Sequence, residues 1–178
     1  MGPLGQLTDK QRAALLGRIN PDRVKELKGM AHLEAWDIRR VLNKIFGICG
    51  WDFEVAETEL VYHHSEEKKR RNGDGTYLAH TVVYRVTGRL ILKDQYGYPI
   101  AHFDDGAAGD ATNQPSVGDA HDMALKTAMS QALKRTAVNL GDQFGLSLYN
   151  DGSLHPTVVA TLVPDAGDYT REPVEESA

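Results

Sequence analysis

Three basic residues follow one edge of a helix predicted between Asp119 and Gly141. Lys134 and Arg135 are adjacent, so their side chains lie about 100° apart, and Lys126 precedes Lys134 by slightly more than two turns. Cations in such a row could bind consecutive phosphates of a nucleic acid. Spacing alone favours the simpler alternative, which is a solvated helix face.

A second and denser positive run lies in a predicted hairpin loop at residues 65–75. Asn72 and Gly73 supply a strong turn signal within this loop. Glu66 and Glu67 partly neutralise the run, so the sequence leaves open whether the loop contacts phosphates or forms a solvated tip. The basic residues of the run are Lys68, Lys69, Arg70 and Arg71.

A helix predicted over residues 33–46 adds a basic outer side. Its apolar residues recur with helical spacing, and its polar faces carry Arg39, Arg40 and Lys44. Trp36 and Trp51 could stack on bases, but both adjoin apolar structure, so we expect them in the core or in subunit contacts.

Residues that could serve an enzyme are scattered along the chain. Histidines and acids could ligate the metal of a nuclease, but adjacent His63 and His64 point to opposite faces of a strand. The chain has no Gly-rich phosphate loop followed by Lys-Ser/Thr and no serine nucleophile elbow. We therefore expect no enzyme, no catalytic residue, no metal site and no cofactor, with a metal-dependent nuclease as the less favoured alternative.

The elements that would position the cations form an α+β domain. Thr8 is placed to cap a first helix, and Asn20 is placed to cap a second helix that Gly29 ends. Three strands follow within residues 51–62, 76–92 and 98–103. Their connections are too short for a parallel crossover, so the strands form an antiparallel meander.

A loop rich in glycine, aspartate and asparagine is expected over residues 104–118, before the long helix that Asp119 would cap. Small and apolar residues recur along this helix at the spacing of one buried face. The positions of the apolar stripe are Met123, Ala124, Ala128, Ala132, Leu133, Ala137 and Leu140. The predicted fold is thus a three-stranded antiparallel meander flanked by helices, in the order helix, three strands, long helix.

The net charge of −5 at first argues against a nucleic-acid partner. Residues 151–178 hold six acids and one base, however, so residues 1–150 are electrically balanced and can still carry a basic stripe. We expect one domain over residues 1–150 and an acidic, largely flexible tail over residues 151–178. Cys49 is the single cysteine and no run of apolar residues is long enough to span a bilayer, so we expect a cytoplasmic protein without membrane contact.

The order of these motifs resembles the Rad52 family of single-strand annealing proteins. Phe46-Gly47-Ile48-Cys49-Gly50-Trp51 resembles the family's Phe-Gly-x-x-Gly-Trp turn, and Leu133-Lys134-Arg135 resembles its Leu-Lys-Arg helix. The resemblance covers residues 19–149. It departs from the family where helix arginines are replaced by Asp37 and Val138, and where residues 112–116 lack the family's loop lysine.

The resemblance implies binding and annealing of single-stranded DNA without ATP, in homologous recombination and double-strand break repair. It implies a homo-oligomeric ring of about ten or eleven subunits. Lys134 and Arg135 match the groove cations of the family, and Lys126 matches a basic position earlier on the helix. An exonuclease or a single-strand binding protein would be the expected protein partner, and the short tail suggests a phage or bacterial member. A double-stranded RNA-binding module remains an alternative because it shares the order of elements.

Overall fold

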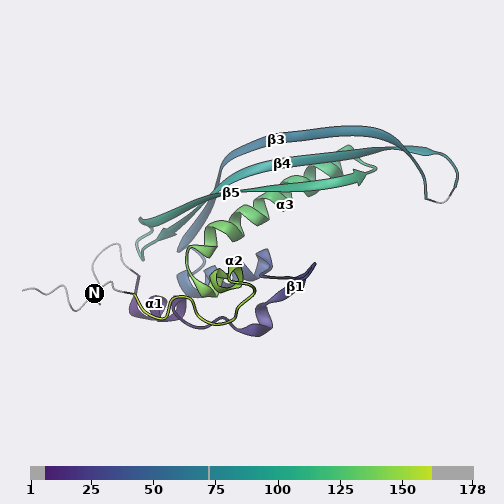
Figure 1. Ribbon diagram of the computed structural model, residues 1–178. Helices are drawn as coiled ribbons and strands as arrows, with labels where there is room; N and C mark the ends of the chain where they lie inside the picture. Colours follow the sequence, from purple (N-terminus) through teal and green to yellow (C-terminus); the bar gives the residue numbers. More distant parts are fainter. Residues whose placement is uncertain (1–6, 72, 162–178) are drawn as a thin grey trace, which may run out of the picture.

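Three long strands and one long helix dominate the computed structural model, which describes residues 7–71 and 73–161 (Figure 1). β3 (Trp51–Lys69), β4 (Thr76–Lys93) and β5 (Pro99–Gln114) form one antiparallel sheet in the order β3-β4-β5. α3 (Val117–Val138) follows β5 and packs on β4 and β5. The predicted α+β order of helix, three-stranded meander and long helix is confirmed.

Small residues let α3 lie close to the sheet. Alanine recurs at every fourth position on the buried face of the helix, at Ala120, Ala124, Ala128 and Ala132. Gly109 of β5 lies directly beneath this row, where a Cβ atom would overlap the backbone of Ala124 and Ala128. The side of β4 that faces the helix supplies larger buried residues, among them Val82, Val86 and Leu90.

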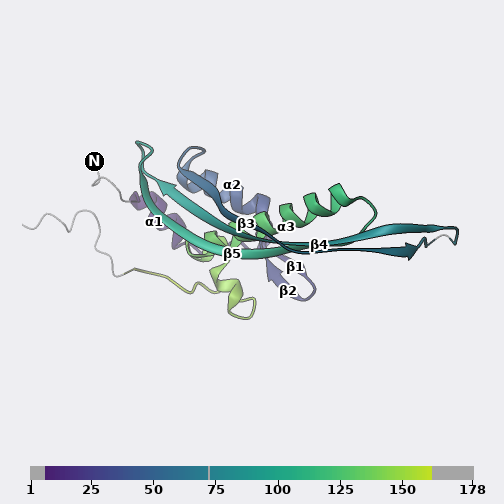
Figure 2. The same ribbon diagram turned by 90° about the horizontal axis from the view of Figure 1, so that it is seen from above.

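The shorter elements form a lower lobe, made by residues 7–50 and 139–161, beneath one end of α3 (Figure 1). It contains α1 (Asp9–Leu15), the 3-10 helix η1 (Pro21–Arg23), a hairpin of β1 (Lys25–Leu27) and β2 (Met30–His32), α2 (Ala35–Phe46), η2 (Asp142–Phe144) and η3 (Leu146–Tyr149). Ile38 and Leu42 of α2 share one hydrophobic core with Leu133 of α3 and Leu90 of β4. The core therefore joins the lower lobe to the sheet and its helix, and the view from above shows α2 and the β1–β2 hairpin on either side of α3 (Figure 2).

Local signals placed two helices correctly. Thr8 and Gln11 form the predicted capping box at the start of α1. α2 occupies the predicted segment and ends at Gly47, whose φ of +86° suits glycine.

The second predicted helix is wrong. Asn20 caps only the single turn η1, and the chain then turns back on itself as the β1–β2 hairpin. Lys28 and Gly29 both have positive φ values, which is the backbone of a two-residue hairpin turn and not of a helix end.

Both predicted loops around the strands are shorter than expected. β3 continues to Lys69, so Lys68 and Lys69 lie on the strand and only residues 70–75 connect it to β4. β5 continues through residues 104–114, because the small residues there fit beneath α3 and pair with β4 instead of breaking the strand.

Ser116, and not Asp119, is the N-cap of α3, with its Oγ accepting a hydrogen bond from the backbone N–H of Asp119 at 3.3 Å. Met123 is exposed and does not belong to the buried stripe.

The first residues of the predicted tail contact the lower lobe. Leu154 packs against the main core, and the backbone N–H and hydroxyl of Thr157 donate hydrogen bonds to buried Asp142 at 2.8 and 2.6 Å. These contacts hold Leu154 and Thr157 against the lower lobe, and the rest of the predicted tail, residues 162–178, lies outside the described residues. Within residues 7–71 and 73–161, no helix is long and apolar enough to cross a membrane.

Candidate nucleic-acid interface

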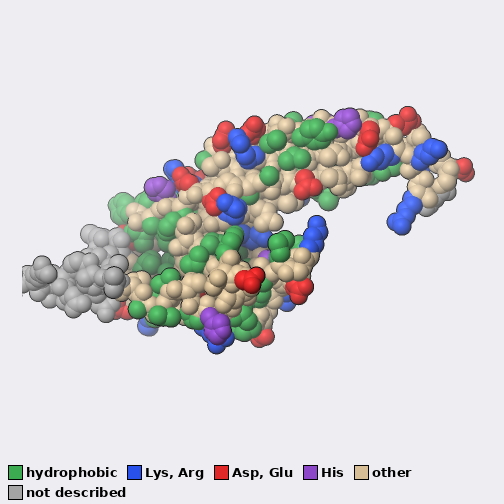
Figure 3. Space-filling view, viewed as in Figure 1, with side chains coloured by type: hydrophobic (Ala, Val, Ile, Leu, Met, Phe, Trp, Pro, Cys, Tyr) green, Lys and Arg blue, Asp and Glu red, His purple; other side chains and the backbone are tan. Residues whose placement is uncertain are grey.

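A cleft separates the β1–β2 hairpin from α3, visible as a recess between the upper and lower parts of the molecule (Figure 3). It holds a cavity of about 900 Å³. Lys134 and Arg135 line the cavity from α3, and Lys25, Leu27 and Met30 line it from the hairpin. The cleft therefore has basic residues on its helix wall.

A second cavity of about 360 Å³ continues along the exposed side of α3. Lys126 and Trp36 contribute to its lining. His32, Gln131 and Lys134 line both cavities, so these residues stand where the two meet. Lys134 is thus the cation at the centre of a groove that runs along the helix.

Lys134 is only half in contact with solvent, and this changes its acid–base behaviour. Burial lowers the pKa of its ammonium below the ordinary value of 10.5, while the carboxylate of Glu34 opposes the change. Lys134 forms no ion pair within residues 7–71 and 73–161, and a partly dehydrated ammonium of this kind gains more from a new anion than a fully hydrated one does. Lys134 is therefore well suited to bind a phosphate.

The other two cations of α3 have carboxylate partners. The guanidinium of Arg135 donates two hydrogen bonds to Oδ1 of Asp105 on β5, at 2.9 and 3.0 Å. Nζ of Lys126 lies 2.5 Å from Oδ2 of Asp122, one turn earlier on the same helix. Both pairs are exposed, and exposed ion pairs contribute little free energy, so either cation can exchange its carboxylate for a phosphate.

The cations predicted on α2 have different positions. Asp37 is 3 % exposed and its carboxylate binds Arg23 at 2.9 Å and Arg40 at 2.5 Å. Arg40 therefore balances the negative charge of buried Asp37. Its guanidinium also lies 6.0 Å from the ring centre of Trp36. Arg39 and Lys44 are exposed and line neither cavity.

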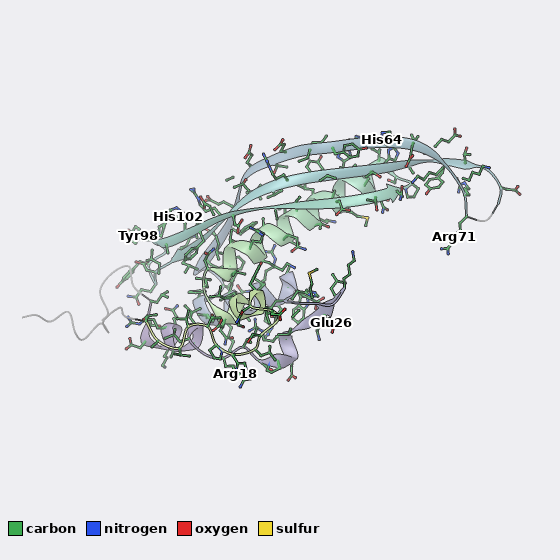
Figure 4. The ribbon with its side chains drawn as sticks, viewed as in Figure 1. Arg18, Glu26, His64, Arg71, Tyr98 and His102 are labelled. Atoms are coloured by element: carbon green, nitrogen blue, oxygen red, sulfur yellow. The ribbon has the colours of Figure 1, made fainter. Side chains whose placement is uncertain are left out.

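The cations of the β3–β4 hairpin lie apart from the cleft. Lys68 donates a hydrogen bond to the side chain of Asn113 at 2.5 Å and lies 2.8 Å from Glu66. Lys69, Arg70 and Arg71 are exposed, and Arg71 stands at the far end of the sheet (Figure 4). Lys134 thus lines both cavities, with Arg135 in the first and Lys126 in the second, and the hairpin run lies apart from them.

Sequence reasoning missed the hairpin wall of the cleft. No periodic pattern in the sequence indicates Lys25, Leu27 and Met30, because two strands of three residues are too short to show one. The turn between the two strands is formed by Lys28-Gly29, where both residues have positive φ values. Trp36 was expected in the core or in subunit contacts, but it is exposed in this chain and lines the second cavity.

Three histidines gather at a separate place, between β3, β4 and α3. The ring of His63 lies 4.9 Å from that of His121 and 5.9 Å from that of His80. His80 shares a hydrogen bond with Ser65, and His121 shares one with Tyr84. Among the described residues, no group of three or more His, Cys, Asp or Glu side chains is arranged to hold a metal ion.

The sequence of this chain matches a known protein family. A sequence model described as "Rad52/22 family double-strand break repair protein" matches residues 8–161, which is most of the chain. The chain belongs to this family.

Several curated relatives of this chain are fungal proteins. The "DNA repair and recombination protein RAD52" of Eremothecium gossypii is 28% identical over 155 residues, covering 84% of this chain and 32% of that protein. The protein radC of Emericella nidulans is 27% identical and rad22 of Schizosaccharomyces pombe 24% identical, over 96% and 90% of this chain and 29% and 33% of those proteins. Both are also described as DNA repair and recombination proteins. The chain spans about a third of the length of these relatives.

Proposed function

We propose that this chain binds single-stranded DNA in the cleft along α3 and anneals complementary strands without ATP. The annealing would serve homologous recombination and the repair of double-strand breaks, as the names of the relatives suggest. The observation that carries the proposal is the position of Lys134, a half-buried cation where two cavities meet. It stands in the Leu-Lys-Arg segment that resembles the family's groove.

Annealing requires that a DNA strand be held with its bases available for pairing, and it requires no reaction centre. A strand held by its phosphates keeps its bases available for Watson–Crick pairing, while bound cations reduce the repulsion between two strands. Lys134 and Arg135 with Lys126 supply this wall of positive charge. No catalytic residue, metal or cofactor is part of the proposal.

A single subunit would bind DNA weakly and with strong salt dependence. Three phosphate contacts give a slope of about −2 in log K against log salt, since each contact to a single strand contributes about 0.7. Repetition of the cleft in a homo-oligomeric ring of about ten or eleven subunits turns weak contacts into tight binding through effective concentration.

β3 offers a surface for this assembly. The strand is 19 residues long and pairs only with β4 in the described residues, and α3 packs on the other two strands. Leu60, Val61 and Tyr62 in its middle are exposed. Exposed apolar residues on an unpaired edge strand are typical of a surface that another chain covers.

The remaining predictions about its biology belong to the same proposal. We propose a cytoplasmic protein that works with an exonuclease or a single-strand binding protein. A phage or bacterial source stays a prediction, since the relatives compared with this chain are fungal. Arg39, Lys44 and the run from Lys68 to Arg71 stay candidate secondary contacts outside the cleft.

The test compares Lys134→Glu with Lys10→Glu, the same charge change on the exposed side of α1. Fluorescence anisotropy with labelled oligodeoxythymidylate should show binding lost at position 134 and kept at position 10. Annealing of complementary oligonucleotides should follow binding, and size-exclusion chromatography should give the same oligomer for all three proteins. Full annealing by Lys134→Glu would refute the proposal, as would preference for duplex RNA or metal-dependent cleavage of the strand.

A further inference from the structure

Two exposed apolar side chains stand at the end of the β1–β2 hairpin. Leu27 and Met30 are 59% and 65% exposed and face each other as register partners across the turn at Lys28-Gly29. Large apolar side chains at the end of a two-stranded hairpin cost free energy in water unless a partner covers them. Both residues line the large cavity of the cleft, so a ligand bound there would contact them.

The two walls of this cavity differ in chemistry. α3 contributes Lys134 and Arg135, whereas the hairpin contributes Lys25 and Glu26 on β1 and, at its turn, the apolar pair Leu27 and Met30. A single strand of DNA has the same two sides, with charged phosphates on one and flat apolar base faces on the other. The cations of α3 and the apolar end of the hairpin therefore suit a single strand whose phosphates lie toward α3 and whose bases lie toward the hairpin turn.

We propose that Leu27 and Met30 act as a wedge that inserts between neighbouring bases of the DNA strand bound by Lys134. The inference rests on the proposed function and adds a base contact to it. Apolar side chains of this kind enter base steps in other DNA-binding proteins, where they interrupt the stack. A wedge between base faces leaves the Watson–Crick edges free, so it is compatible with annealing.

A polar atom near the wedge also lacks a partner. Nδ1 of His32 is buried and has no hydrogen-bond partner among the described residues. His32 lies on β2, pairs in register with Lys25 of β1, and lines both cavities. Buried polar atoms are nearly always hydrogen-bonded, so this nitrogen needs a hydrogen-bond partner that the described residues do not supply.

The experiment uses the full chain and oligodeoxythymidylates that carry 2-aminopurine between two purines at one position after another. The fluorescence of 2-aminopurine rises when its neighbours no longer stack on it, so wild-type protein should raise it at periodic positions. The double variant Leu27→Ser with Met30→Ser should abolish this rise and weaken binding about tenfold, equivalent to about 1.4 kcal/mol. Its salt dependence should stay that of the wild type, because the phosphate contacts remain.

Two further variants make the test specific. Ile48→Ser removes an apolar side chain that is 82% exposed and lines neither cavity, and it should leave the fluorescence rise unchanged. Leu27→Phe with Met30→Phe keeps apolar faces that can stack on bases, and it should retain the rise.

Three results would overturn the wedge. One is an unchanged fluorescence rise in the serine variant, and another is loss of the rise in the phenylalanine variant as well. The third is a smaller oligomer for the serine variant in size-exclusion chromatography, which would assign the pair to a contact between copies of the chain. Failure of the wedge leaves the loss of binding in Lys134→Glu intact, whereas failure of the proposed function shows as wild-type protein that binds no single-stranded DNA.

Discussion

Arg135 on α3 and Asp105 on β5 form a forked contact in which both hydrogen bonds end on the same carboxylate oxygen. The carboxylate competes with any phosphate that approaches this guanidinium. Asp105→Asn should therefore tighten the binding of single-stranded DNA and steepen its salt dependence by about 0.7, the contribution of one phosphate contact. Anisotropy titrations at several salt concentrations measure both quantities.

The neighbouring acid provides a matched control for this variant. Asp104 binds Arg89 at 2.7 and 2.8 Å, and this pair lies on the sheet face opposite to α3. Asp104→Asn makes the same chemical change one residue away and should leave DNA binding unaltered. Equal effects of the two variants would point to net charge, and not to the release of Arg135.

The lowered pKa of Lys134 predicts two opposite responses to pH. DNA binding needs the ammonium, so affinity should fall as pH rises through the lowered pKa, in a range where an exposed lysine is still charged. In the unfolded chain Lys134 regains its ordinary pKa and binds more protons there, so its contribution to the free energy of unfolding should rise over the same range. Lys134→Arg remains charged and should show neither change.

These responses are measured as differences between wild type and Lys134→Arg, so that other titrating groups cancel. Anisotropy gives the affinity, and urea unfolding gives the free energy of unfolding at each pH. A parallel fall of affinity in both proteins would show that Lys134 does not hold the phosphate.

Asp37 should matter for stability, because its charge is buried. Asp37→Ala leaves the guanidinium of Arg23, which is also nearly buried, without its carboxylate partner. Removing one member of a buried pair costs about 3–5 kcal/mol, so urea denaturation should show a large loss. Asp9→Ala removes an exposed acid from a pair on α1 and should cost less than about 1 kcal/mol.

Gly109 should tolerate no side chain. Gly109→Ala would force Ala124 and Ala128 away from β5, and overpacking of this kind costs about 1–3 kcal/mol. Gly106 lies on the same strand, but a Cβ atom there would meet its nearest neighbour at 3.5 Å, an ordinary contact distance. Thermal unfolding should therefore show a clearly lower midpoint for Gly109→Ala than for Gly106→Ala.

Local signals in the sequence were sufficient for some elements and not for others. α1 and α2 were predicted because a capping box and a helical repeat lie within the segments themselves. The second half of β5 was missed because glycine and aspartate indicate a loop, whereas pairing with β4 and the fit of Gly109 beneath α3 decide its structure. These partners lie elsewhere in the chain and leave no local pattern.

The candidate site was predictable to a similar degree. Helical spacing and the Leu-Lys-Arg segment predict Lys126, Lys134 and Arg135 as DNA contacts; in the structure Lys134 lines both cavities, Arg135 the first and Lys126 the second. The partner of Arg135 was not predictable, because Asp105 is 30 residues away. The same is true of Arg40, whose role follows from the burial of Asp37 beside Arg23.

The row of alanines that holds α3 against the sheet has a consequence for the proposed binding of DNA. Lys126 and Lys134 are eight residues apart on this clamped rod, hence about 12 Å along its axis. The packing of α3 keeps the backbone positions of both lysines fixed. The spacing of any phosphates that these two side chains bind would therefore be set before DNA binds. The DNA strand would then adjust the distance between its phosphates, whereas the protein would lose little backbone freedom on binding.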